Sequence, residues 1–404
     1  MKRILYDLTS AQPNHGIKVN GGGEYAYRLL WMIAELTKYE IIILLSKNKG
    51  DISIGDVAGR DLRKSAYYYK SLNEVEDLIN NSKYDALILP VCYPEYGNLN
   101  ISETQLVITT VHDLSTIYTD YVCNEERYVG LSLKNKIYEY IKHYIFYKTV
   151  AQKHINDHQK LLNITKNQLL ITVSQYSKYA MEYYLETKQR DIAVLYPFAD
   201  KEQNYQLSSD LPLIDKYNIS SEQFYLLVSC NRWHKNSFFV MKVIDNMINK
   251  GIWREKYKVV LTGTDNAHRK FYEKHIKNIE YFVFLEYVDS CVLQELYAKA
   301  KALIYPSLYE GFGYPPMEAM KYGTQVIAST ATSIPEVCGT NAHYFSPTNA
   351  EQLSVAILQS FDIERKHVEK ALKEHYRMVR TKQDEDANKL IELIKFKMKE
   401  NDNE

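Results

Sequence analysis

The amino-acid sequence predicts an α/β protein made of two Rossmann-like halves. Short apolar runs alternate with helical stretches along the chain, a pattern typical of parallel sheets covered by helices on both faces. With 404 residues and 46% apolar content, the chain is long enough to bury more than one core. The polar, turn-rich stretch FADKEQNYQLSSDLP (198–212) separates the two halves.

Eleven apolar runs predict the strands of the two sheets. In the first half they cover residues 3–8, 39–46, 84–90, 105–111, 169–174 and 192–196, and in the second half 224–230, 258–263, 282–288, 302–307 and 325–330. We therefore expect a first domain over 1–197, a second over 213–380, and a C-terminal helix and tail over 381–404. Open α/β sheets bind ligands beyond the carboxyl ends of their strands, so a cleft shared by both domains is the expected site.

The overall composition excludes several classes of protein. Lys plus Arg equals Asp plus Glu at 50 each, so the chain has no net positive charge that would attract nucleic acid. The five cysteines include no CxxC pair, which argues against a disulfide framework and against a zinc site. No window has the roughly 18 consecutive apolar residues that a membrane-spanning helix needs. We expect a cytoplasmic protein, either free or peripheral to a membrane.

A glycine run precedes the first predicted helix. In NGGGEYAYRLL (20–30), Gly22 and Gly23 leave backbone N–H groups open to a phosphate at the positive helix end. The run also matches GxGxxA, the pattern of nicotinamide enzymes. However, it comes about ten residues after the first strand, and the second strand lacks the acidic residue that holds a ribose. A plain helix-entry loop is the structural alternative.

Two polar turns follow predicted strands. VSCNRWHKN (228–236) places Arg232 and Lys235 after the first strand of the second half, where two cations suit a diphosphate. TVHDLSTIY (110–118) places His112 and Asp113 at the end of a first-half strand. The alternatives are a solvated helix start for the first turn and a structural histidine for the second.

The stretch LYEGFGYPPMEAMKYG (308–323) sets Glu310 and Glu318 on either side of a turn rich in glycine and proline. Gly311 and Gly313 carry no side chain, so their N–H groups can approach an oxyanion, and the two prolines suit the first turn of a helix. A leaving diphosphate would lie at that helix start. The two carboxylates are too far apart, and too differently placed, to be a simple acid/base pair.

Together these segments resemble the retaining glycosyltransferases of family 4, which have the GT-B architecture. The resemblance is carried by GGGEYAYRLL, TVHDLSTIY, ITVSQYSK, SCNRWHKN, LTGTD and YPSLYEGFGYPPMEAMKYGTQVIASTATSIPEV. It covers residues 1–361 and is strongest over 302–347. It implies transfer of a hexose or deoxyhexose from a nucleotide-diphosphate sugar to a glycan or lipid-linked acceptor in bacterial surface polysaccharide synthesis. Retention of configuration, no metal and no other cofactor are also implied.

The resemblance further implies a role for each matching residue. Those implied to bind the donor diphosphate are Arg232, Lys235, Gly22, Gly23, Gly313 and Tyr314. Those implied to bind the donor sugar are Glu310, Gly311, Phe312 and His112. The implied catalytic residues are Glu310, His112 and Asp113, and the implied nucleoside-binding residues are Glu318, Val283, Leu285 and Tyr287. The chain departs from many relatives at Trp233, His234 and Tyr314. The resemblance therefore does not identify the nucleotide base or the sugar of the donor.

Other readings remain open at this point. One is a sugar-nucleotide epimerase or phosphorylase of the same fold, and another is a sugar-nucleotide binding protein without catalysis. The basic stretch 131–154, rich in lysine and interleaved with Ile, Tyr and Phe, could lie on an anionic membrane surface. Packing of this helix on the first domain's sheet is the alternative.

Overall fold

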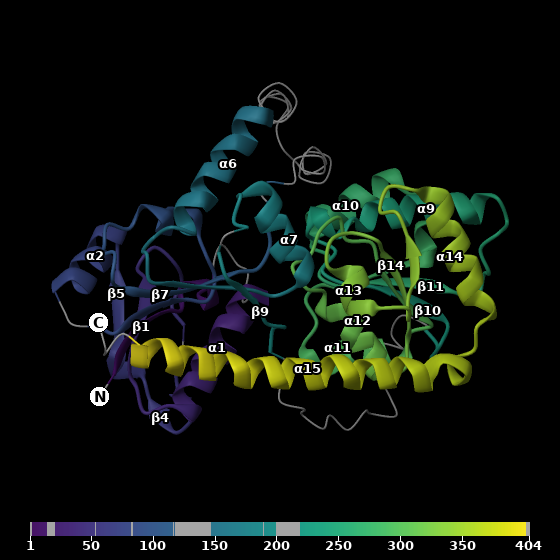
Figure 1. The fold of residues 1–404 in the computed structure, drawn as a ribbon. Helices are drawn as coiled ribbons and strands as arrows, with labels where there is room; N and C mark the ends of the chain where they lie inside the picture. Colours follow the sequence, from purple (N-terminus) through teal and green to yellow (C-terminus); the bar gives the residue numbers. More distant parts are fainter. Residues whose placement is uncertain are drawn as a thin grey trace. The chain divides into compact units, whose positions relative to one another are not determined.

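The structure is a computed structural model that describes residues 2–13, 21–52, 54–81, 84–115, 117, 147–188, 190–198 and 219–400. The described residues form two units: unit 1 contains those of 2–117, 151–198 and 381–400, and unit 2 contains 147–150 and 219–380. Figure 1 shows both units, coloured along the sequence. Nearly all of the predicted linker, and residues 131–146 of the basic stretch, lie outside the described residues.

Unit 1 contains a seven-stranded parallel sheet in the order β5-β2-β1-β6-β7-β8-β9. Its strands are β1 (Arg3–Asp7), β2 (Glu40–Ser46), β5 (Ala66–Tyr69), β6 (Ala86–Leu89), β7 (Leu106–Val111), β8 (Gln168–Thr172) and β9 (Ile192–Val194), and β3 (Asp56–Val57) and β4 (Arg60–Asp61) form a separate hairpin. Six strands were predicted. The edge strand β5 was not, because it is short and half-exposed.

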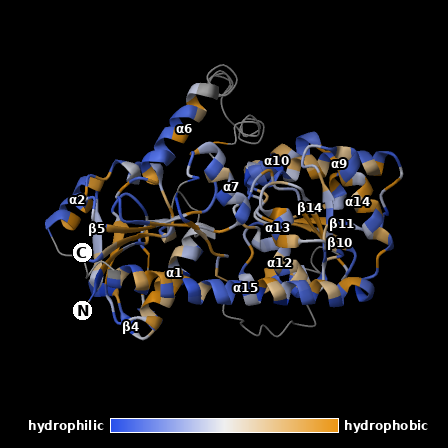
Figure 2. Cartoon of the chain, viewed as in Figure 1, coloured by the Kyte–Doolittle hydropathy of each residue, from blue (hydrophilic) through white to orange (hydrophobic). Residues whose placement is uncertain are grey.

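The helices of unit 1 cover both faces of this sheet, as α1 and α7 show from opposite sides in Figure 1. They are η1 (Thr9–Ala11), α1 (Gly21–Leu36), η2 (Arg63–Ser65), α2 (Leu72–Asn81), η3 (Pro94–Asn98), α6 (Tyr147–Leu161) and α7 (Gln175–Tyr184). The strands are hydrophobic and largely buried (Figure 2), as expected of a parallel sheet enclosed on both sides.

Unit 2 contains a six-stranded parallel sheet in the order β12-β11-β10-β13-β14-β15. Its strands are β10 (Phe224–Leu227), β11 (Lys258–Leu261), β12 (Phe282–Phe284), β13 (Ala302–Tyr305), β14 (Gln325–Ser329) and β15 (His343–Phe345). Its helices are η4 (Trp233–Lys235), α9 (Ser237–Asn249), α10 (Asn266–His275), η5 (Ile279–Tyr281), α11 (Ser290–Lys299), α12 (Tyr314–Lys321), α13 (Ile334–Cys338) and α14 (Ala350–Asp362). The sequence predicted every strand except β15, a three-residue edge strand.

The last helix, α15 (Arg365–Glu400), belongs to both units: its residues up to Arg380 lie in unit 2, and those from Thr381 lie in unit 1. Within unit 1, Gln383 Nε2 donates to the carbonyl of Pro197 (2.7 Å) and Asp386 accepts from the backbone of Tyr196 (2.8 Å). This is the predicted C-terminal helix that crosses back to the first domain. No described helix has the length and apolarity to cross a bilayer.

Each sheet has one switch point, where the strand order reverses. In unit 1 it lies between β1 and β6, and in unit 2 between β10 and β13. The connections that follow such a strand pair run in opposite directions, and ligands of open α/β sheets bind there. The predicted site residues can therefore be placed relative to two defined positions.

Candidate functional site

A buried ion pair lies at the switch point of unit 2. Lys235 ends η4, which follows β10, and Glu310 follows β13. The Nζ atom of Lys235 lies 2.5 Å from Oε1 of Glu310, and the two side chains are only 9% and 15% exposed. Two residues predicted to serve the diphosphate and the sugar separately are thus in direct contact.

The ion pair determines the charge state of its carboxylate. Burial by itself would raise the pKa of Glu310, but the Lys235 ammonium, together with smaller contributions from His234 and hydrogen bonds, holds the pKa below its ordinary value. Glu310 is therefore ionised at neutral pH. Because both charges are largely removed from water, losing either one would leave the other without compensation.

Tyr305, the last residue of β13, joins this pair. Its hydroxyl accepts a hydrogen bond from Lys235 Nζ at 3.2 Å, and the ammonium lies 5.1 Å from the centre of its ring. Burial, and then the nearby Glu310 carboxylate, raise the pKa of Tyr305 well above its usual range. Tyr305 was missed by the sequence analysis, because a tyrosine at a strand end is indistinguishable from a core residue.

The glycine-rich turn after Glu310 is held by a neighbouring turn. Thr332 Oγ1 accepts from the backbone N–H of Glu310 (2.8 Å) and donates to its carbonyl (2.9 Å). Ser333 Oγ lies 2.9 Å from the carbonyls of both Glu310 and Phe312. These residues follow β14, which lies beside β13, so the signal that could have found them is the order of the strands.

Gly313 caps the N-terminus of α12 with a φ of 113°, a value that side chains rarely tolerate. The helix that follows begins with Tyr314, whose ring lies 5.4 Å from that of Phe312. Gly311 lies between these residues and Glu310 in the same turn. The N–H of Tyr314 therefore lies directly beyond the ion pair in sequence, whereas Pro315 and Pro316, the next two residues of the helix, have no N–H.

Glu318 lies one turn inside α12 and has a different neighbour from Glu310. The buried hydroxyl of Tyr297 hydrogen bonds to it, and burial, followed by this carboxylate, raises the pKa of Tyr297 well above its usual range. The two glutamates are thus anchored to different groups, one to a cation and the other to a neutral phenol. The sequence analysis expected them to be differently placed.

The two residues beside Lys235 in the predicted cationic turn are Arg232 and His234. Arg232 is half-buried and caps η4, with its N–H donating to the carbonyl of Ser229 (3.1 Å). His234 stacks on Tyr309, with ring centres 5.0 Å apart. Burial and then Lys235 lower the pKa of His234 to about 4, so it is neutral at neutral pH. The positive charge of this turn comes from Arg232 and Lys235.

The predicted nucleoside-binding segment is only partly accessible. Val283 of β12 is 9% exposed and Leu285 is 4% exposed, whereas Tyr287 is 75% exposed. The carbonyl of Leu285 accepts from the backbone N–H of Thr264 (3.0 Å). Of the three predicted side chains, that of Tyr287 can therefore reach a ligand, and the other two pack inside unit 2.

In unit 1, His112 follows β7 and is fixed by its surroundings. Its Nε2 lies 2.9 Å from the carbonyl of Pro90, which can only accept, so Nε2 carries the proton. The Tyr25 ring packs edge-on against it at 4.6 Å, and burial lowers the pKa of His112. Asp113 accepts from the N–H of Ser115 (2.8 Å). His112 is neutral, and Asp113 closes the turn that follows it.

Gly22 and Gly23 lie in the first turn of α1, whose residues are Gly21–Leu36. A Cβ at position 23 would lie 2.6 Å from the carbonyl oxygen of Ser10 in η1, so only glycine fits there. Packing alone accounts for Gly23. The predicted role of both glycines at a phosphate stays a prediction.

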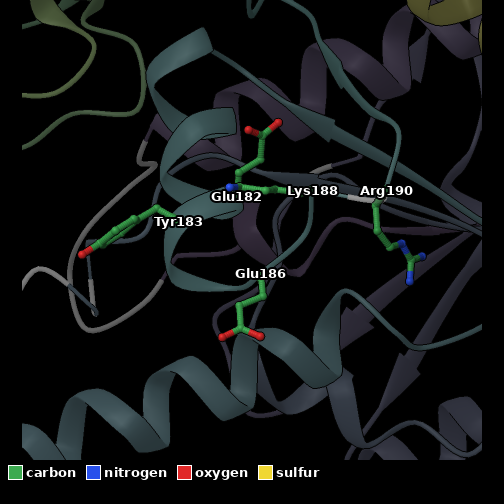
Figure 3. A pocket seen from close by; sticks show the side chains of 5 residues that line it. All are labelled: Glu182, Tyr183, Glu186, Lys188 and Arg190. Atoms are coloured by element: carbon green, nitrogen blue, oxygen red, sulfur yellow. The ribbon is translucent and has the colours of Figure 1, made fainter.

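A hollow of about 490 Å³ is found elsewhere in unit 1, among residues that the sequence analysis did not select. It is lined by Glu182 and Tyr183 of α7 and by Glu186, Lys188 and Arg190 of the segment that follows. Figure 3 shows that these side chains point in different directions and do not converge on one point. We do not assign a function to this hollow.

Sequence comparison finds a family match in the second unit. Residues 225–362 match the family model described as Glycosyl transferases group 1. The chain is 31% identical over 154 residues to O-antigen chain mannosyltransferase B of Escherichia coli, covering 37% of this chain and 40% of that protein. It is 32% identical over 139 residues to O-antigen chain mannosyltransferase RfbU of Salmonella typhimurium, covering 34% and 38%. The chain thus spans about two fifths of these curated relatives.

Structural comparison extends over the whole chain. Sucrose-phosphate synthase from Thermosynechococcus elongatus superposes with a TM-score of 0.67 at 15% identity, covering 98% of both chains. Anabaena Alr3699/HepE, crystallised in complex with UDP and glucose, gives 0.63 at 15% identity, covering 96% of this chain and 99% of that one. These likenesses show the fold, which is GT-B as predicted.

Proposed function

From the match of residues 225–362 to the group 1 glycosyl transferases, we propose that this protein is a retaining glycosyltransferase. It transfers a hexose from a nucleotide-diphosphate sugar to a glycan or lipid-linked acceptor in surface polysaccharide synthesis. The observation that carries the proposal is the buried Lys235–Glu310 pair at the switch point of unit 2, beside the turn that leads into α12. The names of the O-antigen mannosyltransferases support a hexose, with mannose as the first to test.

In this proposal the donor diphosphate lies at the start of α12. Arg232, Lys235 and the positive end of α12 neutralise its charge, which would remove the need for a divalent metal. Tyr314 borders the phosphates, and the N–H groups of Gly22 and Gly23 are proposed to bind phosphate as well. Glu318 hydrogen bonds the ribose, and Tyr287 contacts the base. EDTA-treated protein should therefore keep its activity, and activity that returns only with Mn²⁺ or Mg²⁺ would contradict this point.

The reaction breaks the bond between the anomeric carbon and the diphosphate oxygen and forms a bond from that carbon to an acceptor hydroxyl oxygen. The acceptor proton passes to the departing phosphate oxygen. Attack on the same face as the leaving group would give retention. The ionised Glu310 stabilises the positive charge that develops on the sugar. Neutral His112, whose Nε2–H donates to Pro90, is proposed to accept a hydrogen bond from a sugar hydroxyl through Nδ1.

The test is a donor panel. GDP-mannose, UDP-glucose and dTDP-sugars are each added to the protein, and thermal stability, nucleotide release and the anomers of donor and product are followed. One donor should raise the melting temperature of the protein and release its nucleotide. The product of that reaction should keep the anomeric configuration of the donor sugar. Arg232→Ala should weaken nucleotide binding about tenfold or more, the scale of one lost charge-assisted contact. Inverted product, or release that requires inorganic phosphate, would contradict the proposal.

We also propose that the protein acts in the cytoplasm, with peripheral contact to the membrane through residues 131–154. The lysines of that stretch would be attracted to anionic lipids that carry the acceptor. Sedimentation with phosphatidylglycerol vesicles at low salt, but not with phosphatidylcholine vesicles, is the expected result. Equal sedimentation with both would remove the membrane from the proposal.

A further inference from the structure

We propose that Tyr305 is a positioning residue that fixes Lys235 and Glu310 relative to each other during sugar transfer. Tyr305 is 1% exposed, and its hydroxyl accepts a hydrogen bond at 3.2 Å from Lys235 Nζ, the same atom that lies 2.5 Å from Glu310. Tyr305, Lys235 and Glu310 are therefore neighbours in unit 2, and we refer to these three side chains as the triad. This role rests on the proposed transferase function and adds to it a residue outside the predicted site.

The chemistry of the three groups explains why a hydroxyl is needed. An ammonium has three N–H donors, and two of them are directed at Glu310 and Tyr305. The third can bind a phosphate oxygen while the triad stays intact. A phenol can accept from Lys235 and donate to Glu310 at once, which no aliphatic or phenylalanine side chain can do.

The Tyr305 ring also lies against the turn that leads into α12. A Cβ placed on Gly313, the N-cap of that helix, would lie 3.9 Å from Cε1 of Tyr305. Tyr305 therefore contacts Lys235 of the ion pair, and its ring lies near the residue that caps the proposed diphosphate site. Displacing reacting groups by about 1 Å can reduce a rate about 100-fold, so a side chain that fixes both elements affects turnover more than affinity.

The test compares two buried hydroxyls of the same sheet. Tyr305→Phe removes the triad hydroxyl, and Tyr225→Phe removes a hydroxyl that lies 2.7 Å from Ser360 Oγ. The measurements are GDP and UDP affinity by calorimetry, nucleotide release from GDP-mannose and UDP-glucose, and thermal stability. Tyr305→Phe should keep nucleotide affinity within about threefold and lower turnover about tenfold, the scale of one lost hydrogen bond. Tyr225→Phe should change only thermal stability.

A second measurement separates positioning from packing. Because Tyr305 acts through Glu310, adding Tyr305→Phe to Glu310→Gln should lower turnover less than twofold further. The positioning role would be wrong if Tyr305→Phe had wild-type turnover, or if adding it to Glu310→Gln lowered turnover by a further tenfold. Either result would leave the proposed transferase function standing. A wild-type protein that binds GDP or UDP but releases neither from its sugar would overturn the transferase function and the role of Tyr305 with it.

Discussion

The two switch points carry buried carboxylates in opposite electrostatic settings. In unit 2, Glu310 contacts a lysine and has a lowered pKa. In unit 1, Asp7 at the end of β1 is fully buried, and its Oδ1 accepts from the N–H of Thr9 at 3.2 Å. Burial raises the pKa of Asp7 to about 6, and the attraction of Lys49 offsets only part of this.

The difference shows that position in the sheet does not determine the pKa of a carboxylate. Asp7 ends a strand beside a switch point, Glu310 lies in the turn after such a strand, and both are shielded from water. Lys235 reaches Glu310 directly, whereas Lys49 donates to the carbonyl of Thr9 (3.1 Å) and to Tyr93 Oη (3.2 Å). A cation in direct contact lowers the pKa of a buried carboxylate, whereas a cation held by neutral oxygens leaves the pKa raised. Glu310 therefore stays ionised over a wider range of pH than Asp7.

The largest expected effect comes from breaking the ion pair. Lys235→Ala should lower the free energy of unfolding by about 3–5 kcal/mol, because it leaves Glu310 buried without a cation. Lys250→Ala, at an exposed position, should change it by less than about 0.5 kcal/mol. Urea denaturation followed by circular dichroism measures both. A loss in Lys235→Ala as small as that of the control would mean that the pair is solvated.

The next effect concerns turnover and separates the two glutamates of unit 2. Glu310→Gln should lower turnover about 100-fold or more, about 3 kcal/mol, while nucleotide affinity stays near its original value. Glu318→Gln should instead weaken nucleotide binding, because a ribose contact is made equally in ground and transition states. Single-turnover assays and nucleotide titrations distinguish the two. The reverse pattern would exchange their roles.

A smaller effect tests the carboxylate of unit 1. Since the folded-state pKa of Asp7 lies above its unfolded value, the folded protein binds more protons, and stability falls as pH rises from about 4 to about 6. Asp7→Asn removes this dependence. The free energy of unfolding of the variant minus that of wild type should therefore increase by about 2–3 kcal/mol between pH 4 and pH 7. Denaturation at each pH gives this difference. A constant difference across the range would place the pKa of Asp7 at its ordinary value.

The smallest expected effect tests Gly23, in the first turn of α1, where the helix packs against η1. Gly23→Ala should destabilise unit 1 by about 1–3 kcal/mol, because the added methyl group overlaps the carbonyl of Ser10. Gly21→Ala meets no atom within 4 Å, and should be neutral or slightly stabilising. Melting temperatures without nucleotide measure the packing effect. If Gly23→Ala kept its melting temperature and bound nucleotide more weakly, the main role of Gly23 would be at the phosphate.

The sequence by itself determined the parts of this protein that depend on local periodicity. The apolar runs predicted six strands of the unit 1 sheet and five of the unit 2 sheet, and missed only the short edge strands β5 and β15. The helix that crosses back to unit 1 was also predicted, although it starts earlier, at Arg365. Residues 363–400 contain no glycine or proline to interrupt it.

Only the tertiary structure decided which of the predicted residues meet. Lys235 and Glu310 are 75 residues apart, and they pair because β10 and β13 are neighbours in the sheet. The same strand order places Tyr305 under the pair and Thr332 against the turn that follows Glu310. Strand order arises from long-range packing, which local sequence patterns do not encode, so the contact that sets the charge of the candidate site could be read only from the fold.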